Sequence, residues 1–198
     1  VLSYERISGV DPVTAARALG ALGVALEILG DLEEAASLLQ RSMAVIREKL
    51  GETHADFFDV VAEFTMVAAL QGSLAKAEAM ILGTLDSAKS GDPAAKASLY
   101  RSLFNVFYMQ QKYGEAEKAA GEFLAMSEAR FGLDHPRLLG ALHCLAIAHQ
   151  TQDHVLLHLP IYARRAQIAA KWYGENYWRT RASRIDYASG MMEYPQMH

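Results

Sequence analysis

Five glycines recur along the chain at nearly constant intervals, and this repetition constrains the fold more than any other feature. Gly9, Gly51, Gly91, Gly132 and Gly174 lie 40 to 42 residues apart, and each opens a similar short phrase, such as GVDPVT, GETHAD or GLDHPR. A period of this length in a chain rich in Ala and Leu is typical of stacked supersecondary units that bury their apolar faces against their neighbours. The 198 residues therefore predict an array of about four units.

Each unit carries the signals of two helices joined by a short break. Apolar residues recur at spacings of three and four, which favours amphipathic helices, and no alternating run between hairpin turns indicates a strand. Gly suits the position just after a helix, and Asp-Pro at 11–12 and 92–93 supplies an N-cap followed by a proline suited to the first turn. We expect the first hairpin to comprise helices over 11–29 and 32–50.

The same signals divide the whole chain. We expect the end of a preceding helix over 1–8, four helical hairpins over 9–50, 51–90, 91–131 and 132–173, and a capping segment over 174–198 whose helix spans 176–189. The predicted fold class is all-α. The first residues include neither an initiator Met nor a basic leader, so we expect a piece of a larger protein.

Large and small residues follow a fixed order within each hairpin, which lets two helices cross closely. In the first hairpin these positions are Leu19, Leu22, Gly23 and Leu26, then Ala35 and Leu39. This order resembles the tetratricopeptide repeat, and the period, longer than the usual length of about 34 residues, resembles the repeats of kinesin light chains and of many bacterial and fungal signalling proteins. The resemblance covers 9–178 and implies a right-handed α-α superhelix, a TPR solenoid, whose first helices line a concave groove that binds peptides or partner domains.

The resemblance also implies which side chains face that groove. Carried over one at a time, these are Arg17, Val24, Glu27, Asp59, Met66, Leu70, Arg101, Asn105, Tyr108, His143, Ile147 and Gln150. The central ones combine adaptable apolar surface with hydrogen-bonding groups, so we expect a helix or an extended segment as the ligand. Light-chain grooves are rich in Asn and basic residues that hold acidic peptides bearing Trp. The corresponding positions here are mostly apolar or neutral, which predicts a different partner.

The fourth hairpin contains a group of four histidines over its two helices, at positions 143, 149, 154 and 158. His154 and His158 have the i, i+4 spacing of metal ligands, but no Glu stands between them and no third ligand is evident, so we predict no metal site. We expect His149 and His158 instead to hydrogen-bond across the helix crossing. Cys144 follows His143, yet neighbours on a helix point about 100° apart, so we expect a half-buried thiol rather than a catalytic dyad.

The second helix of the fourth hairpin begins with HVLLHLPIYAR and carries fewer charges than its counterparts. Pro160 predicts a late start or a kink in this helix, because proline has no amide hydrogen to donate. We expect Leu156, Leu157 and Leu159 to pack beneath the last helix together with nearby aromatic residues. The alternative is contact with an adjoining domain or with a second copy of the chain.

The remaining observations limit function by exclusion. A formal net charge of −4 disfavours nucleic acid and anionic lipid, which require a basic surface. No uncharged stretch approaches the roughly 20 apolar residues of a membrane helix, and the single Cys144 suits a reducing compartment, the cytoplasm. No phosphate loop, nucleophile elbow or dinucleotide fingerprint occurs, so we predict no catalytic residue and no cofactor.

These inferences together predict a non-enzymatic scaffold that binds a protein or peptide ligand in a concave groove, as a module of a larger signalling or regulatory protein. The alternative is an intramolecular array that senses or controls an adjoining effector domain, such as a peptidase or a nucleotide-dependent switch. A metal-dependent enzyme is a remote third hypothesis.

Overall fold

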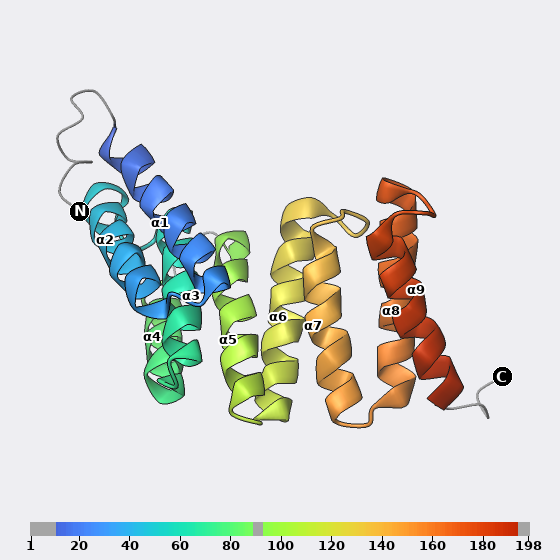
Figure 1. Ribbon diagram of the computed structural model, residues 1–198. Helices are drawn as coiled ribbons and strands as arrows, with labels where there is room; N and C mark the ends of the chain where they lie inside the picture. The colour runs from blue at the N-terminus through green and yellow to red at the C-terminus, as the bar shows by residue number, and fades with distance from the viewer. Residues whose placement is uncertain (1–10, 89–92, 194–198) are drawn as a thin grey trace. The chain divides into compact units, whose positions relative to one another are not determined.

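The computed structural model describes residues 11–88 and 93–193, and every regular element in these ranges is a helix (Figure 1). The elements are α1 (Pro12–Leu29), α2 (Leu32–Leu50), α3 (Ala55–Leu70), α4 (Leu74–Ser87), the short 3-10 helix η2 (Pro93–Lys96), α5 (Ala97–Met109), α6 (Tyr113–Phe131), α7 (Leu138–Thr151), α8 (Val155–Tyr173) and α9 (Trp178–Glu193). The all-helical prediction is confirmed. The helix end expected over 1–8 lies outside the described residues.

The chain divides into two compact units, Val1–Val106 and Phe107–His198. In the first unit, α1 packs against α2, α2 against α3, and α3 against α4. In the second, α6 packs against α7, α7 against α8, and α8 against α9. Each of these helices therefore contacts the next one along the chain, which is the sequential packing that the repeat predicts.

Local sequence signals account for several helix ends. Asp11 caps α1, because its carboxylate accepts the backbone N–H of Thr14 at 2.9 Å, and Pro12 follows in the first turn. The repeat glycines that end α2, α6 and α8 have φ values of 81° to 86°, which favour glycine. The second Asp-Pro behaves differently: Pro93 begins η2, and α5 itself starts only at Ala97. Asp92 lies outside the described residues.

Small residues allow the close helix crossings that the repeat pattern predicts. A Cβ atom placed on Gly23 of α1 would lie 2.8 Å from Cγ of Leu39 and 3.3 Å from the carbonyl oxygen of Ala35, both on α2. Ala35 and Leu39 are fully buried. The next hairpin repeats the arrangement with buried Thr65 and Ala77. These contacts explain why small residues occupy the crossing.

Buried hydroxyl groups connect neighbouring helices in the first unit. Ser42 of α2 donates through Oγ to the carbonyl oxygen of Ala16 at 2.7 Å. Thr65 of α3 and Ser102 of α5 share a hydrogen bond of 2.9 Å between their side-chain oxygens, and Ser102 also donates to the carbonyl oxygen of Ala62. Because each hydroxyl is satisfied, these polar groups remain compatible with the apolar core.

The α8 helix begins at Val155 and contains Pro160, so the predicted late start is wrong. A proline near the start of a helix removes only one backbone hydrogen bond, which packing can offset. Leu159 is buried at 7% exposure, whereas Leu157 is 51% exposed. The side chain of Leu156 lies outside the described residues. A surface for an adjoining domain or a second copy could therefore use Leu157 but not Leu159.

By length and composition, α1 is the one helix in the described ranges that could cross a membrane, with a mean hydropathy of 1.4 over 18 residues. This helix contains Arg17 and Glu27, so it is not an uncharged apolar stretch of the kind that the sequence was expected to lack. Leu22, predicted to fill the crossing, is 49% exposed, because α1 packs mainly against α2 and so buries little of its outer side. Ile28 and Leu29 are also exposed.

Candidate partner-binding surface

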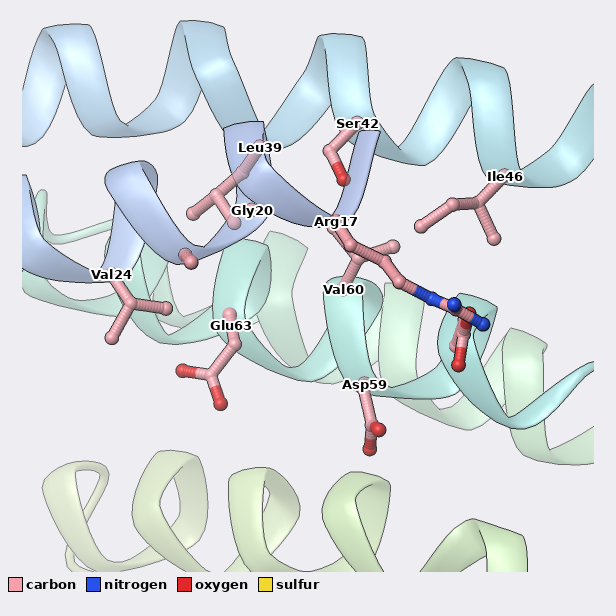
Figure 2. A pocket seen from close by; sticks show the side chains of 11 residues that line it. Arg17, Gly20, Val24, Leu39, Ser42, Ile46, Asp59, Val60 and Glu63 are labelled. Carbon is pink, nitrogen blue, oxygen red and sulfur yellow. The ribbon is translucent and has the colours of Figure 1, made fainter. Parts of the chain in front are cut away.

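A hollow of about 330 Å³ opens beside α1, α2 and α3 in the first unit (Figure 2). It exists because α1 packs broadly against α2 but contacts α3 only marginally, which leaves a space between α1 and α3 above buried side chains of α2. The floor is formed by Leu39, Ser42 and Ile46 of α2, and the walls include Arg17, Gly20 and Val24 of α1 and Asp56, Asp59, Val60 and Glu63 of α3.

A second hollow of about 250 Å³ adjoins the first, because Val24 and Glu63 line both. Its other lining residues are Glu27, Ile28, Met66, Arg101, Ser102 and Asn105. The two hollows form a continuous surface over α1, α3 and the part of α5 that belongs to the first unit, which we call the unit 1 surface.

Two ion pairs stiffen the walls of the unit 1 surface. The guanidinium of Arg17 lies 2.7 Å from Oδ2 of Asp56, and that of Arg101 lies 2.6 Å from Oε1 of Glu63. In Figure 2 the Arg17 side chain extends along the first hollow. Both pairs connect neighbouring first helices, α1 to α3 and α3 to α5, so they hold the walls in place before any ligand arrives.

The unit 1 surface is acidic overall. Four carboxylates, including Glu27 and Asp59, accompany only two guanidinium groups. Asp59 is exposed and forms no ion pair with another described residue. Burial and the nearby charge of Glu63 raise the pKa of Glu27, and Arg101 partly opposes this. The surface therefore carries negative charge that the protein itself does not neutralise.

The predicted groove residues of the first unit mostly meet on this surface. Arg17, Val24 and Asp59 line the first hollow. Val24 also lines the second, together with Glu27, Met66, Arg101 and Asn105. Leu70, at the end of α3, is 42% exposed and lies outside both hollows.

Sequence reasoning missed Glu63 and the floor of the first hollow. Glu63 follows Asp59 by four residues, so the helical period could have placed both carboxylates on one face. No comparable signal exists for Leu39 or Ile46, because the hollow above these buried side chains depends on how far α1 stands from α3.

The predicted groove residues of the second unit lie on α7 and at the end of α5. His143 and Gln150 are exposed and Ile147 is partly buried, so all three are accessible on α7. Gln150 accepts a hydrogen bond from the hydroxyl of Tyr162 at 3.0 Å. Although His143 as a residue is exposed, partial desolvation of its ring by the surrounding protein, helped by the charge of Arg165, lowers the pKa of His143. Tyr108 is 37% exposed and contacts Tyr113 edge to face.

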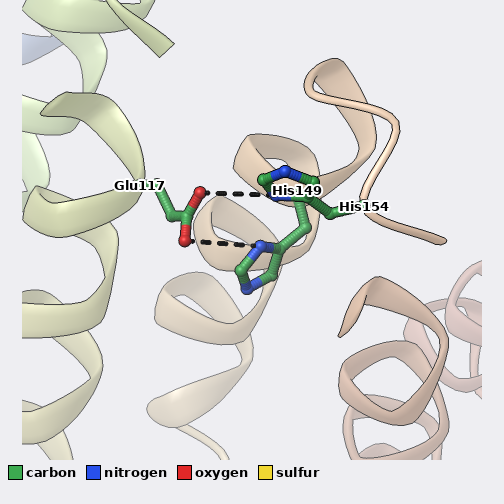
Figure 3. Close-up of side chains that lie close together, drawn as sticks. All are labelled: Glu117, His149 and His154. Atoms are coloured by element: carbon green, nitrogen blue, oxygen red, sulfur yellow. Dashed lines mark ion pairs between the residues drawn. The ribbon is translucent and has the colours of Figure 1, made fainter. Parts of the chain in front are cut away.

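A cluster of Glu117, His149 and His154 lies in the second unit (Figure 3). Nδ1 of His149 is 3.7 Å from Oε1 of Glu117, and Nδ1 of His154 is 3.7 Å from Oε2. Burial lowers the pKa of His149, although Glu117 opposes the shift. The predicted hydrogen bond between His149 and His158 is wrong, because the His149 ring faces Glu117 and His158 packs edge-on to Tyr162.

The tetratricopeptide repeat family matches residues 15–56 and 97–137. These two segments carry tetratricopeptide repeats. No curated protein matches the chain. The resemblance inferred from the repeat pattern is thus confirmed, and this family is usually non-catalytic.

Solved structures of this repeat type show the same fold. Two crystal structures show nearly identical TPR-like repeats of a Podosopora anserina protein assigned as a kinesin light chain. They match with a TM-score of 0.75 each, at 18% and 19% identity, over 95% and 94% of this chain and 90% of theirs. The crystal structure of BtubC (BKLC) from P. vanneervenii matches with a TM-score of 0.66 at 16% identity, over 86% of this chain and 69% of that one. At these identities the likeness shows the fold alone.

Proposed function

We propose that this tetratricopeptide array is a scaffold that binds a protein or peptide ligand, and that the unit 1 surface takes an apolar side chain with Lys or Arg beside it. Tetratricopeptide repeats generally mediate protein–protein interactions. The observation that carries the finer proposal is the pairing of an apolar floor with carboxylates that the protein does not neutralise.

The first hollow supports an apolar anchor. Its floor includes Leu39 and Ile46, which belong to the buried core of the α1–α2 hairpin and therefore hold their positions. Burying one ligand side chain the size of Leu or Met contributes about 1.5–3 kcal/mol. Preformed walls reduce the entropy lost on binding, because the ion pair of Arg17 with Asp56 already exists in the free protein.

The charges support a basic neighbour to that anchor. Asp59 stands at the first hollow and Glu27 at the second. A Lys or Arg side chain of the ligand would gain an ion pair with either carboxylate. It would also offset the charge of Glu63, which adds to burial in raising the pKa of Glu27. An acidic ligand would meet net repulsion here.

A displayed library of random twelve-residue peptides, selected on the immobilised full chain, tests this proposal. We expect enrichment of peptides with Leu or Met next to Lys or Arg, and at least tenfold weaker binding of the best peptide to the Asp59→Lys variant. Glu48→Gln is the matched control, because Glu48 is an exposed carboxylate on α2 outside the surface. Enrichment of acidic peptides, or equal binding by the Asp59→Lys variant, would contradict the proposal.

We propose further that the array serves as a module of a larger signalling or regulatory protein and acts in the cytoplasm. The compartment is supported by the cysteine count of the chain, because a single cysteine, Cys144, cannot form an internal disulfide and such usage suits a reducing compartment. Imaging of a fluorescent fusion of the full-length protein tests the compartment.

A further inference from the structure

The turn between α7 and α8 brings two imidazoles together opposite a carboxylate of α6. His149 lies near the end of α7, and His154 is the residue just before α8. Asp153 adopts a φ of 59°, which reverses the chain so that the N–H of His154 donates to the carbonyl oxygen of His149 at 2.9 Å. The backbone therefore holds the two rings near each other, and α6 supplies Glu117 (Figure 3).

We infer that Glu117, His149 and His154 form a binding site for a divalent transition metal ion, with zinc as the best match. The three ligand atoms, one from each residue, all lie within 4.8 Å of one another. Each Nδ1 is 3.7 Å from a carboxylate oxygen, which is too long for a hydrogen bond. Ligands of a tetrahedral zinc ion with bonds of about 2.1 Å stand about 3.4 Å apart, so small rotations of the side chains would close the site.

A second observation points to a ligand at this position. His149 is only 8% exposed, and its buried Nδ1 has no hydrogen-bond partner among the described residues. A buried polar atom without a partner is costly. This atom faces the carboxylate and the second imidazole, so an ion bound between them would satisfy it.

The surroundings hold the carboxylate in place. Nε2 of Gln152 donates to Oε2 of Glu117 at 2.6 Å and to the carbonyl oxygen of Ala148 at 3.0 Å. Partners of this kind orient metal ligands and strengthen binding. Gln152 belongs to the same turn as the two imidazoles, so the turn contributes both ligands and their support.

The donor set selects the class of ion and its role. Two imidazoles with one carboxylate suit zinc and its transition-metal neighbours, whereas calcium and magnesium prefer oxygen ligands alone. Three protein ligands leave a fourth position for water. Because the ligands come from α6 and from the α7–α8 turn, a bound ion would connect consecutive hairpins of the second unit and stabilise their packing.

Titration of the full chain, without an affinity tag, with zinc chloride in an isothermal calorimeter tests the site. We expect one ion per chain, and the cobalt complex should show the intense visible absorption of tetrahedral coordination. The exposed ligand variant His154→Ala and the variant Glu117→Gln should weaken zinc binding at least tenfold. Gln152→Ala should weaken it by about tenfold, as expected for an outer partner.

The control variant His54→Asn removes an exposed imidazole outside the cluster but keeps a side chain that can cap α3, and it should bind zinc like the unmodified chain. Zinc should raise the melting temperature of that control but not of His154→Ala. Circular dichroism of each variant without metal confirms that it is folded. Absence of stoichiometric zinc binding, or equal binding by the folded His154→Ala and Glu117→Gln variants, would overturn the inference.

Discussion

Replacing Gly23 with alanine sets two opposing effects against each other at the crossing of α1 and α2. Alanine is the better helix former, and the exchange in a helix interior contributes about 0.8–1.0 kcal/mol of stability. However, the added Cβ would stand 2.8 Å from Cγ of Leu39, a distance that real Cβ atoms do not show. Leu39 is fully buried, so it cannot rotate into solvent, and the two helices must move apart.

The stability lost through the clash of the added Cβ should exceed the stability gained from the higher helix propensity of alanine. Overfilling a well-packed core costs about 1–3 kcal/mol, so the net expectation for Gly23→Ala is a loss of about 1 kcal/mol, within a range of about 0–2 kcal/mol. Gly83→Ala is the control, because Gly83 lies in α4 of the same unit with nothing within 4 Å of its Cβ position. That variant should gain about 0.5–1 kcal/mol.

Gly20→Ala provides an intermediate case, since its Cβ would lie 3.3 Å from Oγ of Ser42. Urea unfolding followed by circular dichroism should rank the variants Gly83→Ala, Gly20→Ala and Gly23→Ala from most to least stable. Shortening Leu39 to Val in the Gly23→Ala background should recover part of the loss, as a favourable coupling in a double-mutant cycle. A Gly23→Ala variant as stable as Gly83→Ala would refute the close crossing.

Three further predictions concern single contacts. Because the pKa of Glu27 is raised, the folded chain holds the carboxyl proton of Glu27 up to a higher pH than the unfolded chain does. The stability that this protonated carboxyl contributes is therefore lost as the pH rises above about 4.5. Glu27→Gln should remove this loss and raise stability at pH 7 by at most about 0.5 kcal/mol. Thr65→Val should cost about 1 kcal/mol in urea unfolding, because Thr65 loses its buried bond to Ser102. Asp186→Asn should cost about 1.5–3 kcal/mol, because Arg165, only 15% exposed, loses the partner that joins α8 to α9.

Matched variants give these predictions their controls. Glu48→Gln, at an exposed position, should not reproduce the pH response of Glu27→Gln. Combining Thr65→Val with Ser102→Ala should cost less than the two changes summed. Glu175→Gln breaks an exposed ion pair with Arg184 and should cost less than about 1 kcal/mol. The Glu27 prediction fails if Glu27→Gln leaves the pH dependence of stability unchanged. The Thr65 prediction fails if the stability losses of the two single variants add up to that of the double variant. The Asp186 prediction fails if Asp186→Asn costs no more stability than Glu175→Gln.

The sequence alone determined the helices and their crossings, because the signals for both are local. Asp11 and the repeat glycines specify helix ends through their own backbone and side-chain chemistry, which is why the first hairpin was predicted to within one residue. The buried positions of Gly23, Ala35 and Leu39 followed from the spacing of large and small residues. The accessible faces of the first helices followed only in part from the helical period of 3.6 residues, since Leu22, predicted to fill the crossing, is 49% exposed.

Only the tertiary structure decided what lies opposite each face. The i, i+4 spacing pairs His154 with His158, yet the fold places His154 and His149 against Glu117, more than thirty residues earlier in the chain. The same holds for the floor of the first hollow, which depends on the separation of α1 from α3. The distance and rotation between helices result from the packing of many side chains at once. No local sequence pattern predicts that combined result.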